Sequence, residues 1–311
     1  MKILVAGEAV VDFFPINLNN QQAFIPKPGG SPFNVAVGLS RLRVPTGFLG
    51  KISTDPFGHL LRSYLIENRV DIRYLMEDDR PSSLAFVFLE QGDEPAFQFY
   101  GANTADSNLT PADIPDSLYT TIETIHLGSL AMIREPTGSA LIKLVKQEYK
   151  HRVISFDPNV RPSQIPDRHV YLRKLNDWLR VVDIFKLSQS DASYIFPGHP
   201  VEKLANQWLE MGPSLVVVTR GSQGAEAFTK SGTVTVETPK VHVVDSVGAG
   251  DAFTAGFLAA LFHLGQLKKE LLGRIDLEIL RRALEFAARA AALTCTKRGA
   301  DPPWLSELGK P

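Results

Sequence analysis

The sequence predicts an α/β protein with a doubly wound, mostly parallel sheet and a small inserted β-lid. Three observations support this fold class. Short apolar stretches alternate with helix-length stretches through much of the 311-residue chain. Two further strand-like stretches, near residues 83–101, follow each other with no helical segment between them. Polar, glycine-rich segments stand directly after several of the apolar stretches. Alternation of this kind is typical of parallel sheets.

Composition limits the possible functions. A chain of this length suggests one or two domains, and we expect residues 1–311 to form a single one. With 44% hydrophobic and 22% charged residues it can bury a large core, and its formal net charge of −1 gives no electrostatic case for nucleic acid or a membrane surface. The single cysteine, Cys295, excludes an intrachain disulfide and fits a reducing cytoplasm. No apolar stretch is long enough to span a membrane.

The chain begins with an apolar stretch at 3–6, which predicts a buried strand rather than a signal peptide. Glu8 follows, and then Asp12 stands among apolar neighbours. Asp12 is either a solvent-facing strand residue or a ligand contact. Position alone favours the solvent-facing interpretation.

The next segment is Gly29-Gly30-Ser31-Pro32-Phe33-Asn34. Ser31 before Pro32 predicts a helix start, with the serine hydroxyl as N-cap and proline at the first helical position. The paired glycines allow a ligand to touch the backbone, and Asn34 offers a donor and an acceptor, a lining that suits an uncharged sugar. The alternative is a tight loop before a core helix.

A strand is predicted at 47–52, and Asp55-Pro56 repeats the cap-and-proline start for a helix to about residue 68. Residues 83–90 and 96–100 predict a hairpin with a polar turn at 91–94. With residues 11–27 they form the expected lid, which would cover a substrate and exclude water. The same strands could also be an ordinary sheet edge or a dimer surface.

The alternation returns from residue 122. Strands are predicted at 122–127, 153–156, 184–187 and 215–219, and helices at about 136–149, 168–180 and 201–211. Polar segments follow these strands at 128–129, 157–161, 188–191 and 219–224. Because ligands bind at the carboxyl ends of parallel strands, these loops predict one cleft. Taken singly, Arg161 could be a surface residue, and Gly221 and Gly224 could simply make a turn.

The segment Asp245-Ser246-Val247-Gly248-Ala249-Gly250-Asp251 precedes an apolar, alanine-rich helix. The first N–H groups of that helix and its dipole make an anion site. A carboxylate beside an anion site is useful if it takes a proton from a hydroxyl that attacks phosphorus. The sequence therefore predicts phosphoryl transfer to an alcohol with Asp251 as base; alternatively, Asp251 only caps the helix.

Several other chemistries lack their motifs. There is no G-x-x-x-x-G-K-[ST] loop, and Phe253 stands where the third glycine of a dinucleotide-binding fingerprint belongs. H-E-x-x-H, C-x-x-C and G-x-S-x-G are also absent. We expect His126 and His242 to be packed or capping residues.

Together these residues resemble the ribokinase-like, or PfkB, carbohydrate kinases over essentially the whole chain. The segment 245–251 followed by Ala255-Gly256 matches the family's C-terminal signature, and 29–34 matches the N-terminal one. The segments 7–13, 30–39 and 157–162 look most like those of bacterial fructokinases. The resemblance implies a cytoplasmic, ATP- and Mg²⁺-dependent sugar kinase, possible use of K⁺, and a homodimer formed through the lid.

The resemblance also implies roles for individual residues. Asp251 is the base, with an anion hole formed by Gly248, Ala249 and Gly250. The sugar is held by Asp12, Gly29, Gly30, Asn34, Phe99, Asn159 and Arg161. The nucleotide is held by Lys186, Ser188, Thr219, Gly221 and Gly224. Asp191 orders Mg²⁺ through water, and Asp245 with Val247 binds a monovalent cation.

The chain departs from the family pattern at two places. Ser188-Gln189-Ser190-Asp191 replaces Asn-x-x-Glu, and Gly101 follows Phe99-Tyr100 where fructokinase-like members often carry arginine. Fructose is the expected substrate; the alternatives are 2-keto-3-deoxygluconate, another sugar or a nucleoside. A non-catalytic sugar or nucleotide sensor is the alternative from another class, and Asp251 argues against it because a sensor needs no base.

Overall fold

The larger of two sheets forms the body of the protein. A computed structural model describes residues 1–88 and 96–311. The body sheet has the strand order β13-β12-β11-β10-β9-β8-β1-β4-β5. Its strands are β1 (Ile3–Ala6), β4 (Thr46–Ser53), β5 (Asp71–Asp78), β8 (Thr124–Gly128), β9 (Val153–Asp157), β10 (Ile184–Ser188), β11 (Leu215–Thr219), β12 (Ala225–Thr229) and β13 (Gly232–Val236). The antiparallel pairs described in this sheet are β11–β12 and β12–β13, and its other described pairs are parallel. The predicted doubly wound, mostly parallel sheet is therefore confirmed.

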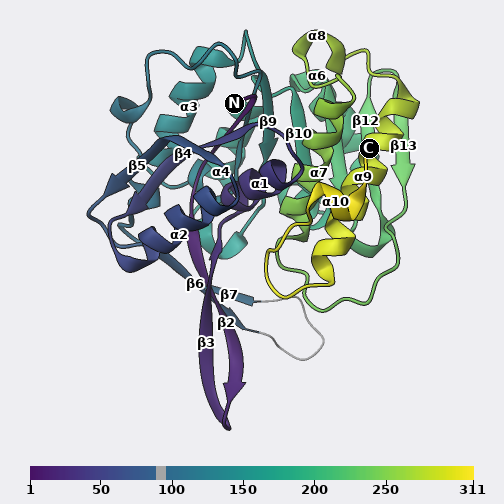
Figure 1. The fold of residues 1–311 in the computed structure, drawn as a ribbon. Coiled ribbons are helices and arrows are strands. Elements are labelled where there is room, and N and C mark those ends of the chain that lie inside the picture. The colour runs from purple at the N-terminus through teal and green to yellow at the C-terminus, as the bar shows by residue number, and fades with distance from the viewer. Residues whose placement is uncertain (89–95) are drawn as a thin grey trace.

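Helices cover both faces of this sheet (Figure 1). They are α1 (Ser31–Arg41), α2 (Pro56–Glu67), α3 (Thr137–Glu148), α4 (Arg168–Leu179), α5 (Gln189–Ile195), α6 (Val201–Met211), α7 (Ala249–His263), α8 (Lys269–Leu272), α9 (Leu277–Cys295) and α10 (Leu305–Leu308). Because side chains of a strand alternate between faces, Ile3 and Val5 enter the core beneath α1, α7 and α9, whereas Leu4 enters the core beneath α3, α4 and α6. Within the described ranges, no helix combines the length and apolar character that crossing a bilayer requires.

Helix α7 is enclosed by the rest of the protein. Every residue from 252 to 261 is buried, and the helix packs against α1 on one side and α9 on the other. A helix that is apolar all round is stable only in such a core position. The N-terminus of α7 is therefore held rigidly beside the carboxyl edge of the sheet.

The smaller sheet has the order β3-β2-β6-β7. Its strands are β2 (Val10–Leu18), β3 (Gln21–Gly29), β6 (Ser83–Phe88) and β7 (Ala96–Tyr100). The antiparallel pairing of β6 with β7 is the predicted hairpin, although the predicted turn at 91–94 and the strand end at 89–90 lie outside the described residues. The β2–β3 hairpin projects from the body at the bottom of Figure 1.

The two predicted helix starts had different outcomes. Asp55 is the N-cap of α2, where its carboxylate accepts the N–H of Gly58 at 2.7 Å, as predicted. The N-cap predicted at Ser31 is wrong: Gly30 is the N-cap, and Ser31 is the first helical residue. The serine hydroxyl makes no capping bond because it donates to Asp251 instead.

Candidate active site

A cleft of about 610 Å³ lies where the carboxyl ends of the parallel strands meet the lid. Strand β1 lies between β8 and β4, so chain direction along the sheet reverses there, and such a switch point is the usual ligand site of this fold. The cleft is lined by most of the predicted site residues: Asp12, Gly30, Asn34, Phe99, Asn159, Arg161, Lys186, Ser188, Asp191, Thr219, Val247, Gly248, Gly250 and Asp251.

Five predicted site residues do not line this cleft: Gly29, Ala249, Gly221, Gly224 and Asp245. Two of them have evident structural tasks. A Cβ on Gly29 would stand 2.7 Å from Cγ of Asp12, so Gly29 leaves room for that carboxylate. The carboxylate of Asp245 accepts the N–H of Val247 at 2.9 Å and that of Gly299 at 2.8 Å, which fixes the loop before α7.

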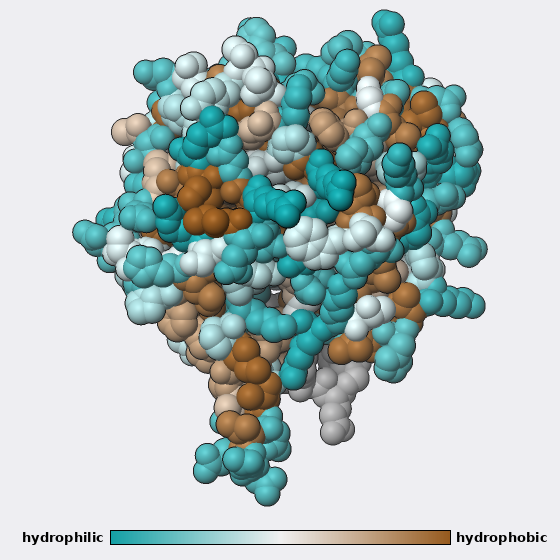
Figure 2. Space-filling model, viewed as in Figure 1, coloured by the Kyte–Doolittle hydropathy of each residue, from teal (hydrophilic) through white to brown (hydrophobic). Residues whose placement is uncertain are grey.

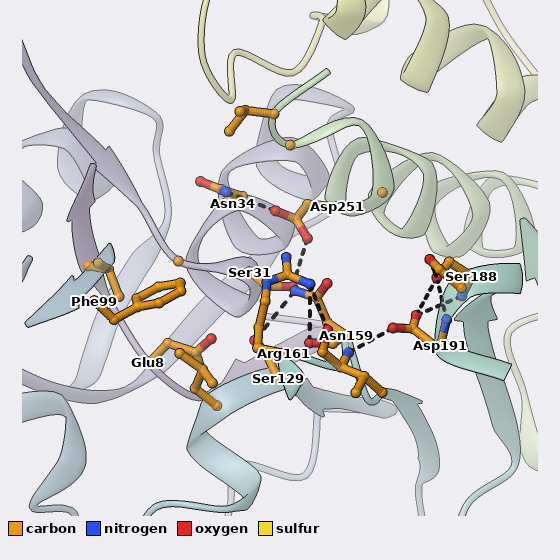
Figure 3. Close-up of a pocket in the computed structure, with 18 of the residues that line it drawn as sticks. Glu8, Ser31, Asn34, Phe99, Ser129, Asn159, Arg161, Ser188, Asp191 and Asp251 are labelled. Carbon is orange, nitrogen blue, oxygen red and sulfur yellow. Dashed lines mark hydrogen bonds between the residues drawn. The ribbon is translucent and has the colours of Figure 1, made fainter. Parts of the chain in front are cut away.

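The carboxylate of Asp251 is oriented by two side chains of α1 (Figure 3). The hydroxyl of Ser31 donates to Oδ1 at 2.7 Å, and Nδ2 of Asn34 donates to Oδ2 at 2.8 Å. Burial raises the pKa of Asp251, while these hydrogen bonds and the charge of Lys186 lower it and Asp157 raises it further; the net shift is upward. A fixed carboxylate with a raised pKa is suited to accept a proton.

The N-terminus of α7 presents backbone donors beside this carboxylate. Gly248 is the N-cap in the left-handed conformation, with φ 78°. The N–H of Ala249 donates to the carbonyl of Ser246 at 3.2 Å, whereas in the described part of the chain the N–H groups of Gly250 and Asp251 form no hydrogen bond. Such free amides, together with the helix dipole, favour a bound anion.

A buried lysine lies next to this helix turn. Nζ of Lys186, from β10, donates to Oδ2 of Asp157 at 2.7 Å and lies 3.4 Å from the carbonyl oxygen of Gly250. Burial lowers the pKa of Lys186, but Asp157, with smaller contributions from Asp191 and Asp251, raises it more, so the amine stays charged. Lys186 thus brings a positive charge next to the first turn of α7 and Asp251.

Asp12 and Arg161 both line the cleft, and their opposite charges interact. Asp12 is 7% exposed, and burial, followed by repulsion from Asp251, raises its pKa to about 7, although Arg161 lowers it. Nη1 of Arg161 donates to the carbonyl of Val160 at 3.1 Å. Asp12 is therefore buried in the wall of the cleft, and the solvent-facing interpretation is wrong, because β2 belongs to the lid sheet.

Asp191 has an observed structural role. Its Oδ2 accepts the backbone N–H and the hydroxyl of Ser188, and its Oδ1 accepts the N–H of Val160 at 2.8 Å. The hydroxyl of Ser188 in turn accepts the N–H of Asp191, which completes a capping box at the start of α5. Asp191 therefore joins the loop after β9 to the loop after β10.

Several cleft residues were not predicted as site residues: Glu8, Val10, Ser31, Ser129, Leu130, Val160, Pro162, Ser163, Ser190, Tyr194 and Ser246. Ser129, Val160 and Ser190 belong to loops that were predicted to form the cleft, although no individual role was assigned to them. Glu8 stands near the carboxyl end of β1, so the rule that found those loops applies to it too. The role of Ser31 could not be found locally, because its partner lies 220 residues away.

The two histidines considered in the sequence analysis, His126 and His242, differ in burial. His126 is buried and its Nδ1 lies 3.0 Å from the hydroxyl of Ser155, as expected for a packed histidine; burial lowers its pKa to about 4. His242 is exposed, so the expectation of a packed residue is wrong for it.

A guanidinium occupies the space beside Gly101, the position where the sequence departs from the family pattern. A Cβ at residue 101 would stand 2.5 Å from Nη1 of Arg134. The same nitrogen lies 3.7 Å from the buried carboxylate of Asp106. A larger residue at 101 would therefore have to displace the guanidinium of Arg134.

The fold and cleft are those of an α/β protein in which a buried carboxylate stands beside free backbone amides at the switch point of a parallel sheet. The family model for pfkB family carbohydrate kinases matches residues 1–307. The chain is 38% identical over 280 residues to the fructokinase of Rhizobium leguminosarum bv. trifolii, covering 90% of this chain and 85% of the relative. It is 33% identical over 302 residues to the fructokinase of Escherichia coli, covering 96% and 94%.

Solved structures agree with this result. The fructokinase with bound ATP from Xylella fastidiosa superposes with a TM-score of 0.90 at 28% identity, covering 99% of this chain and 96% of the other. A fructokinase double mutant from Vibrio cholerae O395 in fructose, ADP and potassium ion bound form gives 0.85 at 28% identity, covering 96% and 93%. The chain belongs to the pfkB family of carbohydrate kinases and has the ribokinase-like fold.

Proposed function

We propose that the protein is an ATP-dependent fructokinase that phosphorylates a primary hydroxyl of fructose, with Asp251 as the base. The observation that carries this proposal is the arrangement at Asp251: a carboxylate held by Ser31 and Asn34 directly beside the free amides of an enclosed helix N-terminus. The fructokinase relatives and the structures bound to fructose with ADP support the same substrate.

The reaction is a direct transfer. Asp251 takes the proton of the sugar hydroxyl while the sugar oxygen attacks the γ-phosphorus of ATP. The bond from that phosphorus to the oxygen that bridges it to the β-phosphorus breaks, and ADP leaves. The free amides of Gly250 and Asp251 and the charge of Lys186 stabilise the negative charge on the transferring group. The anion hole thus uses Gly250 and Asp251, while Ala249 closes a turn.

The sugar and the nucleotide occupy opposite sides of Asp251 in this proposal. Figure 3 shows Glu8 and Phe99 on one side of the cleft and Ser188 and Asp191 on the other. The first side, with Asp12, Gly30, Asn34, Asn159 and Arg161, would hold the sugar. The second, with Lys186, Ser188 and Thr219, would hold the phosphates, and the nucleotide would extend toward the glycine turn at 221–224.

The two proposed metal ions, Mg²⁺ and K⁺, would be held by different kinds of group. Among the described residues, no group of three or more His, Cys, Asp or Glu side chains is placed to hold a metal ion. Mg²⁺ keeps several waters and is commonly bound through substrate phosphates, so a water-mediated contact from Asp191 is compatible with this arrangement. When bound, Mg²⁺ neutralises phosphate charge. For K⁺, the loop of Asp245 and Val247 offers backbone carbonyls, since the Asp245 carboxylate already accepts two amides.

The charge of the sugar side favours a neutral substrate over a sugar acid. Glu8, Asp12 and Asp251 all line the cleft there, and Arg161 is the cation that faces them. The carboxylate of 2-keto-3-deoxygluconate would meet more acids than bases, whereas the hydroxyls of fructose meet acceptors. Because acidic side chains outnumber basic ones there, we propose fructose rather than the sugar acid as the substrate.

We further propose that the protein is one α/β domain, residues 1–311, that forms a homodimer through its lid. Phe86 stacks on Phe13 at a centroid distance of 4.8 Å and meets Phe24 and Tyr100 edge-on, so these rings share one face of the lid. Tyr100 is 59% and Phe88 43% exposed. Figure 2 shows apolar side chains along the projecting hairpin. Large exposed apolar patches mark interaction sites.

The proposed dimer can be tested by measuring the mass of the protein in solution. Sedimentation equilibrium should give twice the chain mass of 34.3 kDa, and replacing Phe88 and Tyr100 with serine should return the mass to that of one chain. A wild-type monomer at assay concentrations would contradict the lid dimer without affecting the proposed reaction.

The cytoplasm is the proposed location. The only cysteine, Cys295, is a free thiol, and the proposed phosphate donor is ATP. Both fit a reducing, nucleotide-containing compartment.

The test of the proposed function is ADP release from Mg²⁺-ATP with a panel of acceptors: fructose, ribose, 2-keto-3-deoxygluconate and adenosine. We expect the highest kcat/KM with fructose. Higher kcat/KM with another acceptor would move the substrate and keep the mechanism. Ligand-induced stabilisation without turnover on any acceptor would instead support a sensor.

A further inference from the structure

Glu8 is a buried acid in the wall of the cleft that has no counter-ion. It follows β1, is 2% exposed, and lines the cleft on the sugar side. Its Oε2 accepts the N–H of Ala131 at 3.0 Å. Over the described ranges, no lysine, arginine or histidine nitrogen lies within ion-pairing distance of its carboxylate. An acid in this position needs a separate explanation, because an unpaired buried charge is unfavourable.

Strained backbone at two neighbouring residues points to the same wall. Ser129 and Asn159 follow β8 and β9, and both have positive φ, 58° and 38°, although neither is glycine. Nδ2 of Asn159 lies 3.4 Å from the hydroxyl of Ser129, and both residues line the cleft. Non-glycine residues in this conformation persist where the surroundings enforce them and concentrate at ligand sites. Glu8, Ser129 and Asn159 thus form one polar wall.

A purely structural role does not account for Glu8. The bond to Ala131 uses one carboxylate oxygen, and an uncharged amide would accept it equally well. Burial raises the pKa of Glu8 to about 7, partly offset by a hydrogen bond from Ser129 and increased further by the nearby acid Asp106. The two carboxylate oxygens offer about four acceptor sites, so after the bonds from Ser129, Ala131 and its own backbone N–H the carboxylate can still accept a hydroxyl of a bound sugar.

We infer that Glu8 binds the sugar hydroxyl at the end remote from the transferred phosphate, and so selects which end of the sugar reaches Asp251. The inference rests on the proposed function. Fructose carries a primary hydroxyl at each end, so a site with one base needs a second contact to distinguish the two ends. The wall of Glu8, Ser129 and Asn159 meets that need because it lies on the sugar side of the cleft.

The test compares kcat/KM for two proteins, wild type and Glu8→Ala, on two substrates, fructose and an analogue that lacks one hydroxyl. Fructose can be made without one or the other of its two primary hydroxyls. The analogue that lacks the transferred position cannot be phosphorylated there, so the analogue that is still phosphorylated lacks only the remote hydroxyl. For wild-type protein we expect kcat/KM for this analogue to be about 10- to 100-fold below that for fructose, mainly through KM. Glu8→Ala should lose the same factor on fructose and show no further loss with the analogue.

Two control variants separate binding from packing. Glu8→Gln keeps an acceptor for Ala131 but offers the sugar hydroxyl a neutral and therefore weaker partner, so its preference for fructose over the analogue should lie between those of wild type and Glu8→Ala. Asp106→Asn changes a neighbouring buried acid that does not line the cleft, so it should keep the wild-type ratio of the two substrates. If Glu8→Ala does not fold, a shifted ratio in Glu8→Gln supports the inference and an unchanged ratio overturns it.

The two possible failures can be told apart. A wild-type preference for fructose over the analogue in Glu8→Ala, or no preference in wild type, would overturn the inference about Glu8 while the kinase remains. Absence of wild-type turnover on fructose would contradict the proposed function instead, and the same comparison on the sugar that is phosphorylated would then decide the role of Glu8.

Discussion

Asp251→Asn is expected to lower kcat by about 10²- to 10⁴-fold, the usual contribution of a general base. Binding of fructose and of ATP should change little. The asparagine oxygen can still accept from Asn34, and the asparagine amide can donate to the hydroxyl of Ser31, so both hydrogen bonds that orient the side chain survive. Steady-state ADP release gives kcat, and calorimetry gives the two binding constants.

The pH dependence checks the same assignment. A base works only when it is deprotonated, so activity falls as the pH decreases through its pKa. Because burial raises the pKa of Asp251, the acid limb of kcat/KM should lie above the usual carboxyl value of about 4. Titration of Asp12, with a pKa of about 7, is expected to contribute to the same limb.

Two results would contradict this mechanism. One is a kcat for Asp251→Asn close to that of wild type. The other is equal loss of turnover and of fructose binding in the variant, which would show that Asp251 holds the sugar rather than accepting its proton.

The body of the fold was predictable because its determinants are local. Apolar stretches such as those of β1 and β11 are continuous, and both ends of the predicted α6 agree with the structure. The edge strand β5 has charged residues along its length and lacks clear alternation, so no pattern indicated a strand there. Helix α9 was not predicted, although its periodic apolar face and Asp276 N-cap were available as signals.

The site was predictable only in part, since many of its contacts join distant segments. The loops after the strands were found because topology alone places them at one edge. The hydroxyl of Ser31 could cap its own helix or bind another residue, and only the packing of α1 against α7 decides between them. Asp191 illustrates the opposite case: Ser188-x-x-Asp191 is a capping-box pattern that sequence could have identified.

Gly248→Ala is expected to reduce both activity and stability. At φ 78° an alanine is strained by about 1–2 kcal/mol. Its Cβ would also stand 2.5 Å from Cβ of Ala300, and overpacking typically adds about 1–3 kcal/mol. Relief of the clash moves the first turn of α7 and its amides, so kcat should fall by about 10²- to 10³-fold, as for loss of an anion-hole donor.

Gly265→Ala provides the matched control at the other end of the same helix. Gly265 follows α7 with φ 70°, yet a Cβ there would meet no atom within 4 Å. This variant should therefore show the conformational cost alone, with wild-type kcat. Denaturant unfolding and ADP release on both variants separate strain from damage to the anion hole. Equal kcat in the two variants would mean that the backbone position of Gly248 does not control phosphoryl transfer.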